Sequence, residues 1–378
     1  MFGLIYSWGT IAPAIHVQSG WSQSILDLTF SLTPLALLPS VVMAGHGLRR
    51  ITPKTMLAAA LGCFTLGGLA GLAIATPLAF LLGYGVLALG CGAGLSTAAC
   101  IAIVSRHHPH RRGMLSGALL ALYGASSAVS APLFHWFDGP FHWRGALAIL
   151  MALYAAAGWI CLTALPAIAA PDRHAARPAG LWRLLRHPPL RAALGLILLA
   201  APLGSAAFAV IGHLAHDLGY APPYAVAAVA VMAMGNGAGR LGFGTLADLR
   251  SPLFARDAAL MVNALAAAIL LAGLTGLDGG MTLLFPPLMG LAFGGMAGKL
   301  AALANRLVTG SADQAFGLLF GTFALASFLG PLADAAFGMR PALVGLALAA
   351  LLAWPLARLV ARPRAIDAPE RSAAGTGI

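Results

Sequence analysis

Residues 191 to 212 read RAALGLILLAAPLGSAAFAVIG, a stretch in which Arg191 is the only charged residue. About twenty apolar residues in succession are long enough to cross the hydrocarbon core of a bilayer as a helix. Similar apolar runs, separated by proline, glycine or charged residues, recur along the chain. The sequence therefore predicts an all-α membrane protein with about twelve transmembrane helices.

The predicted spans form two sets of six. The first run has only about fifteen residues, which predicts either a short first helix or a true start upstream of Met1. The first set comprises residues 1–15, 25–46, 55–75, 78–103, 114–134 and 145–168, and the second comprises 191–212, 223–246, 258–275, 280–304, 315–337 and 341–360.

The composition agrees with this fold class. Hydrophobic residues make up 60% of the chain and charged residues 9%, whereas a soluble domain carries roughly a quarter charged residues. The abundance of Ala, Leu and Gly argues against an outer-membrane barrel, whose strands need an alternation of polar and apolar residues. The net charge of +11 does not indicate nucleic-acid binding, because the basic residues lie in short gaps between apolar runs.

The positions of Lys and Arg predict the orientation. All but four of the 22 fall in segments that are cytoplasmic if the N-terminus is inside, as the positive-inside rule requires. Arg144 and Arg340 fall on the opposite side, and Arg240 and Lys299 fall within spans. We therefore expect a multi-pass protein of the plasma membrane, the inner membrane in a bacterium, with both termini cytoplasmic.

An internal repeat relates the two sets of spans. At one offset of 199 residues, three groups of residues match at the same place in each set, which predicts two parallel six-helix repeats. The offset pairs Gly45, Arg49 and Pro53 with Gly244, Asp248 and Pro252, Pro132 with Pro331, and Gly20 with Gly219.

The repeat sets the predicted domain organisation. We expect an N-terminal bundle over residues 1–169, a cytoplasmic linker over 170–190, a C-terminal bundle over 191–361 and a cytoplasmic tail over 362–378. Within the linker, residues 181 to 186 predict an amphipathic turn or two on the membrane surface.

Three stretches carry a family resemblance that extends over nearly the whole chain. They are Tyr6-Ser7-Trp8-Gly9 with Gly20-Trp21-Ser22, then Arg106 to Gly117 followed by Pro132, and finally Asn236-Gly237-Ala238-Gly239-Arg240 with Gly244-Thr245-Leu246-Ala247-Asp248. In this order, they resemble three parts of the major facilitator superfamily: the first helix with the loop that follows it, the connection from the fourth to the fifth helix with a proline at the end of the fifth, and the eighth helix with the loop after it. Within it, the monocarboxylate transporter and oxalate/formate antiporter branch is the most similar.

The chain departs from the superfamily pattern in the loop after the second helix, which forms gating contacts in that family, and in the eleventh helix. Arg49, followed by Arg50, stands where an aspartate is usual after the second helix, while the second-half copy keeps its acid as Asp248. The first-half gating contacts, near Arg111 and Arg112, must therefore be made differently or be weaker. No basic residue lies between 313 and 334, where oxalate-exchanging members carry a lysine, which argues against a dicarboxylate substrate.

Arg240 is the strongest candidate for binding an anion. A guanidinium inside a span is costly unless it faces a wet cavity or a partner, and it fits a carboxylate. The alternative is an arginine that snorkels to the cytoplasmic surface. Asn236, one helical turn earlier, lies on the same face. Tyr6 and Tyr123 either hydrogen-bond the anion or pack in the core.

Three other polar residues have two interpretations each. Lys299 is either a substrate ligand or a snorkelling lysine near the end of its span. Asp27 either carries a proton or favours the start of its helix. His213 either titrates near neutral pH as a proton carrier or belongs to a gate or interface.

These residues predict a secondary transporter that moves a small organic anion, a monocarboxylate, by symport or antiport, with a proton as the simplest coupling ion. The expected partners are this anion, the bilayer and the proton, with no nucleic acid, metal or cofactor. The alternatives are a carrier for drug or metabolite efflux, which would need acidic groups in the spans, and a membrane sensor that does not transport. Because no nucleophile with a base occurs in the spans, an enzyme is not expected.

Overall fold

The computed structural model describes residues 1–165, 180–217, 222–276, 281–308 and 310–359. Within these ranges the chain is helical and contains no strand. The helices of the first half are α1 (Phe2–Tyr6), α2 (Trp8–Ser19), α3 (Gln23–Gly47), α4 (Pro53–Ala73), α5 (Pro77–Phe80), the π-helix η1 (Leu81–Cys91), α6 (Gly92–His107), α7 (Arg112–Ala125) and α8 (Ser127–Ala164).

The second half repeats this helical pattern after the short helix α9, which occupies the stretch predicted to be amphipathic. Its elements are α9 (Leu181–Leu185), α10 (Pro188–Asp217), α11 (Pro222–Leu249), α12 (Pro252–Leu274), the 3-10 helix η2 (Met281–Leu284), α13 (Phe285–Gly298), α14 (Leu300–Leu307), α15 (Ala312–Phe337) and α16 (Met339–Leu359).

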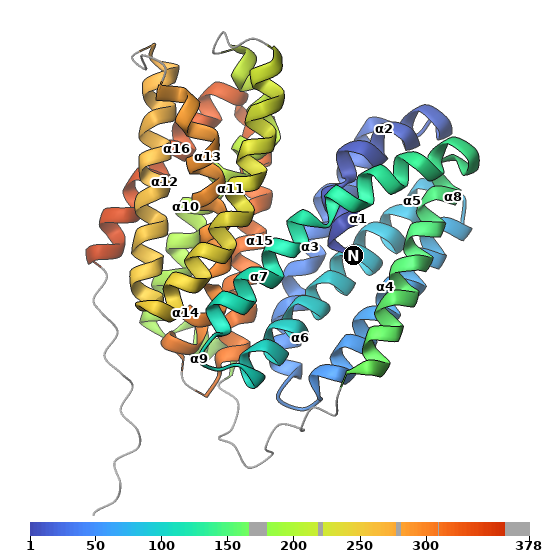
Figure 1. The fold of residues 1–378 in the computed structure, drawn as a ribbon, viewed down its shortest axis with the longest axis horizontal. Coiled ribbons are helices and arrows are strands. Elements are labelled where there is room, and N and C mark those ends of the chain that lie inside the picture. Colours follow the sequence, from blue (N-terminus) through green and yellow to red (C-terminus); the bar gives the residue numbers. More distant parts are fainter. Residues whose placement is uncertain (166–179, 218–221, 277–280, 309, 360–378) are drawn as a thin grey trace, which may run out of the picture.

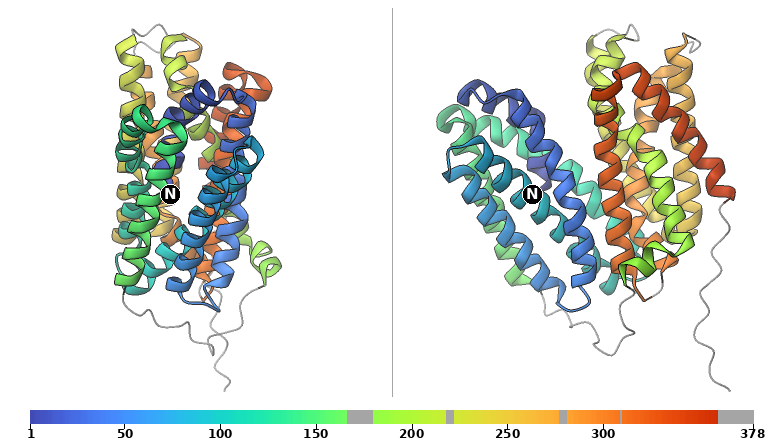
Figure 2. Two further views of the ribbon diagram at one scale, coloured as in Figure 1. Left: turned by 90° about the vertical axis from the view of Figure 1, so that its right-hand side faces the viewer. Right: turned by 180° about the vertical axis from the view of Figure 1, so that it is seen from behind.

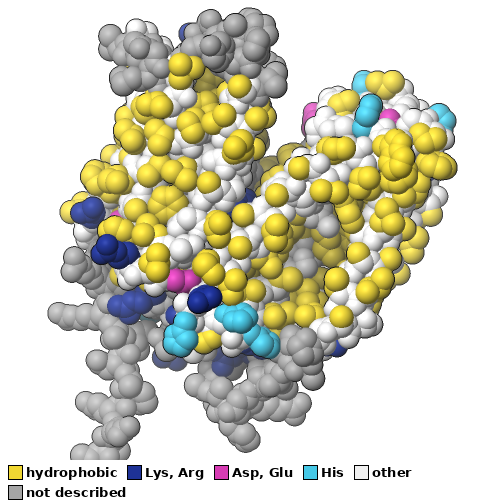
Figure 3. All heavy atoms as spheres, viewed as in Figure 1, with side chains coloured by type: hydrophobic (Ala, Val, Ile, Leu, Met, Phe, Trp, Pro, Cys, Tyr) yellow, Lys and Arg dark blue, Asp and Glu magenta, His cyan; other side chains and the backbone are white. Residues whose placement is uncertain are grey.

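Each predicted span coincides with one or more of these helices, so the all-α membrane fold is confirmed. By length and apolarity, 8 helical segments of the described chain qualify as spans, or 9 if the bent pair at residues 282–307 counts as one. The number is below twelve partly because α7 and α8 run together as one 53-residue segment, although two spans were predicted there. Figure 3 shows hydrophobic side chains over the flanks of the visible face, as a bilayer requires.

One predicted helix boundary is wrong. Pro132, expected to close the fifth helix, lies inside α8. The helical geometry is instead interrupted at His142, which has a φ of 56° and a ψ of 166°. A proline inside a helix removes one hydrogen bond but does not by itself end the helix when neighbouring helices support it. The left-handed backbone at His142 interrupts α8 more strongly.

The predicted repeat is visible in the way helices begin. The side chain of Thr52 accepts a hydrogen bond from the Thr55 amide at the start of α4, and proline follows at the first helical position. Ser251 caps α12 in the same way, through the Phe254 amide and again with a proline next. Residues 52 and 251 are related by the 199-residue offset, so the two halves use the same capping chemistry.

The helices of the two halves approach each other at one end of the molecule and diverge at the other (Figures 1 and 2). The loop after α3 and the starts of α7 and α15 lie at the end where they meet, which we call the closed end. The opposite end, where Figure 3 shows a V-shaped notch between the halves, is the open end. α7 packs along α11 and α3 along α15, so these two helix pairs join the halves.

Glycine allows the backbones to approach closely at the closed end. A Cβ atom on Gly45 of α3 would lie 2.5 Å from the carbonyl oxygen of Asp313 in α15. A Cβ atom on Gly244 of α11 would collide with the carbonyl of Gly113 in α7. Gly45 and Gly244 are paired by the 199-residue offset, so each half presents an equivalent glycine to a helix start of the other half.

Candidate functional site

Arg240 lies on α11 at the junction of the two halves. Its Nε donates a hydrogen bond to Asn236 Oδ1 at 3.1 Å, one turn back on the same helix. Its Nη1 donates to the carbonyl oxygen of Leu120 on α7 at 2.7 Å, and its Nη2 to the hydroxyl of Tyr6 on α1 at 3.2 Å. The guanidinium therefore bridges from the second half to two helices of the first.

The glycines beside Arg240 permit this position. A Cβ atom on Gly117 of α7 or on Gly298 of α13 would collide with the carbonyl oxygen of Arg240. Two neighbouring helices thus approach the backbone of α11 at the height of the arginine. The side chain is 3% exposed, which excludes the interpretation that it snorkels into water.

The charge of Arg240 has no acidic partner among the described residues. All three hydrogen-bond acceptors are neutral: an amide oxygen, a carbonyl and a hydroxyl. The ion pairs of the described chain are Arg106 with Asp313 and Arg256 with Asp257. A buried cation without a counter-ion is costly, so its environment favours an incoming anion.

Tyr6 and Tyr123 both lie near Arg240. The Tyr123 ring stacks on Phe2 with centroids 4.0 Å apart, and Tyr123 lies on α7 three residues after Leu120, whose carbonyl accepts a hydrogen bond from Arg240. Tyr6 is 44% exposed, in contrast to the buried arginine that it contacts. Of the predicted substrate residues, the structure thus places Asn236 and the two tyrosines with Arg240.

Lys299 lies elsewhere, inside the second half. Its Nζ donates to the carbonyl of Gly295 at 2.9 Å, and the residue is 3% exposed. It lines a cavity of about 20 Å³ between α10, α12 and α13, where Arg256 and Asp257 interact with it electrostatically. The lysine marks the 43° bend between α13 and α14 and makes no described contact with the Arg240 group.

Of the two candidate proton carriers, Asp27 has a described side chain, and it lies apart from Arg240. Asp27 lies in the first turns of α3, is exposed, and accepts a hydrogen bond from Gln23 at 2.9 Å. His213 falls within α10, but its side chain lies outside the described residues. Asp27 makes no described contact with the arginine.

At the closed end, Asp248 joins α11 to the start of α7. One carboxylate oxygen accepts the backbone N–H of Gly113 at 3.0 Å and the other accepts that of Met114 at 2.8 Å. The first amides of a helix have no partner within the helix, and the helix dipole favours an anion there. Arg111 and Arg112 form the cap and first residue of α7 and so position these amides.

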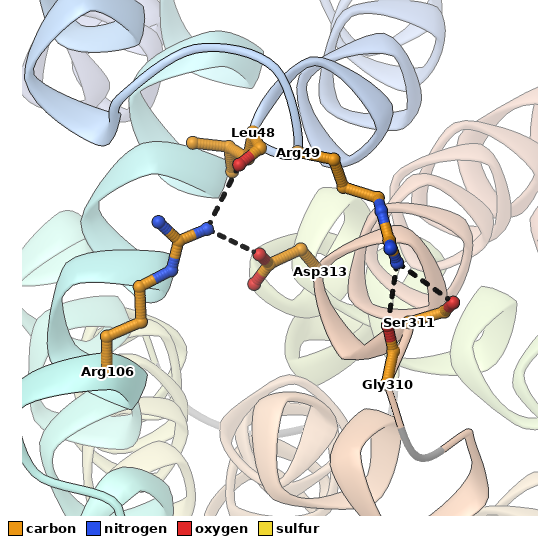
Figure 4. Close-up of polar contacts among 6 residues, drawn as sticks. All are labelled: Leu48, Arg49, Arg106, Gly310, Ser311 and Asp313. Carbon is orange, nitrogen blue, oxygen red and sulfur yellow. Dashed lines mark hydrogen bonds and ion pairs between the residues drawn. The ribbon is translucent and has the colours of Figure 1, made fainter. Parts of the chain in front are cut away.

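The first half makes its closed-end contacts with arginine, as shown in Figure 4. Arg49 Nη1 donates to the carbonyl oxygen of Gly310 at 2.7 Å and to the Ser311 hydroxyl at 3.3 Å, just before α15 begins. Arg106 on α6 forms an ion pair with Asp313 at 2.8 Å and also donates to the Leu48 carbonyl at 3.2 Å.

Sequence reasoning assigned gating roles to Arg49, Arg50, Asp248, Arg111 and Arg112 but missed the ion pair. Arg50 is exposed. Arg106 and Asp313 are 207 positions apart in the chain, and no spacing rule connects them. The only signal was chemical: an acid just before a predicted span, with basic residues in a loop of the other half.

The fold and these contacts define a class, namely a multi-pass helical membrane protein whose two related halves meet around a buried cation. A sequence profile described as the Major Facilitator Superfamily matches residues 1–331. The chain therefore belongs to the Major Facilitator Superfamily, which confirms the resemblance found in the sequence.

Known relatives carry the comparison further. The chain is 33% identical to monocarboxylate transporter 13 of Bos taurus over 195 residues, covering 50% of this chain and 44% of the relative. It is 32% identical to human (Homo sapiens) monocarboxylate transporter 11 over 265 residues, covering 66% of this chain and 55% of the relative. The matches thus span about half the length of these relatives.

Solved structures support the fold alone. The transporter FucP, crystallised in the outward conformation, superposes with a TM-score of 0.69 at 14% identity and covers 96% of this chain and 98% of FucP. A bacterial homologue of the iron transporter ferroportin, in an outward-facing state, gives 0.68 at 14% identity, covering 95% of this chain and 96% of the homologue.

Proposed function

We propose that the chain is a secondary active transporter that moves a small organic anion, a monocarboxylate, across the plasma membrane by alternating access. The observation that carries the proposal is the Arg240 guanidinium, buried between the halves and bound only to neutral acceptors among the described residues. The similarity to monocarboxylate transporters 11 and 13 supports the same class of substrate.

The geometry suggests how an anion binds. A carboxylate accepts two parallel N–H bonds from a guanidinium in fork geometry, which is stronger than a bond to a neutral acceptor. An incoming carboxylate would therefore compete with the Tyr6 hydroxyl, whose 3.2 Å contact is the longest of the three. Asn236 would keep Arg240 oriented through its contact with Nε. A single cation suits a single carboxylate.

Transport requires the halves to rock about this site. In the present conformation the open end gives access, while contacts of Asp248, Arg49 and the Arg106–Asp313 pair hold the closed end. Release on the other side requires these contacts to break. Because Arg240 bonds to Leu120 and Tyr6 of the other half, occupation of the site and the relative position of the halves are linked.

The direct test measures uptake of labelled short monocarboxylates into proteoliposomes. We expect saturable uptake by the parent and loss of at least about 90% in Arg240→Ala, since a charge-assisted bond contributes about 1.5–3 kcal/mol. Arg250→Ala, which removes an exposed arginine at the end of α11, is the matched control and should retain uptake. Equal uptake by the parent and a folded Arg240→Ala variant would reject the assignment.

Proton coupling is a further part of the proposal, with Asp27 and His213 as candidate carriers. Asp27 is exposed near the start of α3, where water can exchange protons with it. A pH gradient should accelerate uptake by the parent, and Asp27→Asn should remove this acceleration if Asp27 is the carrier. An efflux carrier for cationic compounds would instead be expected to need an acid at the Arg240 site, where the described residues supply none.

A further inference from the structure

A groove runs along the outer side of the first half, between α4 and α8. Its volume is about 660 Å³, and its walls come from residues 64–73 of α4 and 141–155 of α8. These helices lie at the far side of the first half from the second half (Figures 1 and 2). The groove therefore faces the lipid and not the Arg240 site.

The walls are almost entirely apolar. Large exposed hydrophobic side chains border the groove on both helices, including Leu69 at 62% exposure and Phe141 at 53%. Gly68 and Gly145 line it as well. Such a surface is suited to a hydrocarbon chain and not to a polar solute.

Arg144 is the one charged residue that lines the groove. Its guanidinium lies over the ring of Trp143, 5.0 Å from the ring centroid. Its Nε is buried and has no hydrogen-bond partner in the described structure, and no ion pair of the described residues includes it. One cation at the mouth of an apolar groove is complementary to an amphipathic anion.

The dimensions select a lipid among such anions. Arg144 lies just after the break at His142, at the open end, and Ala155 lies eleven residues further along α8. At 1.5 Å per residue this stretch is about 16 Å long, and half of a bilayer's hydrocarbon core is about 15 Å thick. A headgroup at Arg144 would therefore place an acyl chain along the groove to the middle of the membrane.

We propose that this groove binds an anionic phospholipid of the leaflet at the open end, with the headgroup phosphate on the Arg144 guanidinium and one acyl chain between α4 and α8. The phosphate gives the guanidinium an anionic partner, which it lacks among the described residues, and the exposed hydrophobic residues cover the chain. The proposal is independent of the transported substrate.

The test uses phosphatidylglycerol with a diazirine in the acyl chain, cross-linked to the full-length protein in detergent and mapped by peptide mass spectrometry. Labels are expected within residues 64–73 and 141–155. Unlabelled phosphatidylglycerol should displace them about tenfold more effectively than phosphatidylcholine with the same chains, because the charged contact at Arg144 supplies the preference. Mapping is needed because the many arginines at the closed end also attract anionic lipids.

Variants separate the headgroup contact from the chain contact. Arg144→Ala should remove the preference for phosphatidylglycerol in the groove, while Arg340→Ala, at an exposed arginine at the start of α16, should retain it. Ala148→Phe should abolish groove labelling by filling the space while Arg144 remains. No labelling of the groove, an unchanged preference in Arg144→Ala, or an equal loss in Arg340→Ala would overturn the proposal.

Discussion

The Asp248→Asn variant should weaken the closed end with little change in side-chain shape. Both carboxylate oxygens accept amides of α7, at 3.0 and 2.8 Å, and they face the positive end of that helix. Hydrogen bonds to charged groups contribute about 1.5–3 kcal/mol each, and asparagine keeps one acceptor oxygen. We therefore expect the variant to destabilise this conformation by about 2 kcal/mol, which shifts the equilibrium about 30-fold toward the conformation in which the closed end has opened.

Distances between spin labels measure this shift. In a background without Cys63, Cys91, Cys100 and Cys161, one pair of labels is placed at the exposed closed-end residues His108 and Arg250. A second pair is placed at Trp136 and Thr275, which are exposed at the open end. Double electron–electron resonance should show that Asp248→Asn lengthens the first distance and shortens the second in a larger fraction of molecules.

Two other aspartates provide the comparison. Asp257→Asn removes the same charge, but Asp257 pairs with Arg256 of its own half at 2.7 Å and should not affect the equilibrium. Asp313→Asn breaks a pair whose side chains are 29% and 27% exposed, so we expect about 0.2–1 kcal/mol and a smaller shift. An Asp248→Asn variant with unchanged distances, or an equal effect of Asp257→Asn, would refute the reasoning.

Two further substitutions test packing and burial. Gly317→Val should also move the two halves apart at the closed end, because its Cβ would lie 2.8 Å from the carbonyl of Val41 on α3. The spin-label distances measure this movement. Gly345→Val, with no atom near its Cβ, is the control for the change in helix propensity. Lys299→Met should raise the free energy of unfolding by on the order of 1 kcal/mol, and with it the melting temperature, because it replaces a buried ammonium. The further rise in melting temperature on adding a short monocarboxylate should be the same as in the parent. Loss of that rise would instead place Lys299 in the binding site.

The sequence predicted the helices well because bilayer thickness and backbone satisfaction constrain them strongly. It predicted helix starts where proline follows a capping hydroxyl, as at Thr52 and Ser251. It failed at Pro132 because a helix supported by its neighbours tolerates proline, and the actual break depends on the backbone of His142. The residue type at position 142 does not predict that conformation.

The candidate site was predictable only in part. Arg240 and Asn236 are one turn apart, so helical periodicity alone puts them on one face. Periodicity does not say toward which helix a face points. Lys299 illustrates this limit, because it follows Gly298, which packs on Arg240, yet its own side chain turns into the second half next to Arg256. Contacts between distant segments, such as Arg106 with Asp313, require the packed structure.

The two departures from internal symmetry at the closed end explain each other. The 199-residue offset pairs Asp248 with Arg49 and Asp313 with Met114. At the start of α7 the helix offers free amides and no acid, so the loop supplies the carboxylate of Asp248. At the start of α15 the acid Asp313 is already on the helix, and a loop aspartate would face a like charge. Arg49 instead donates to the Gly310 carbonyl, and Arg106 neutralises Asp313. The first half therefore keeps a closed-end contact at the place where its aspartate is missing, with donor and acceptor exchanged.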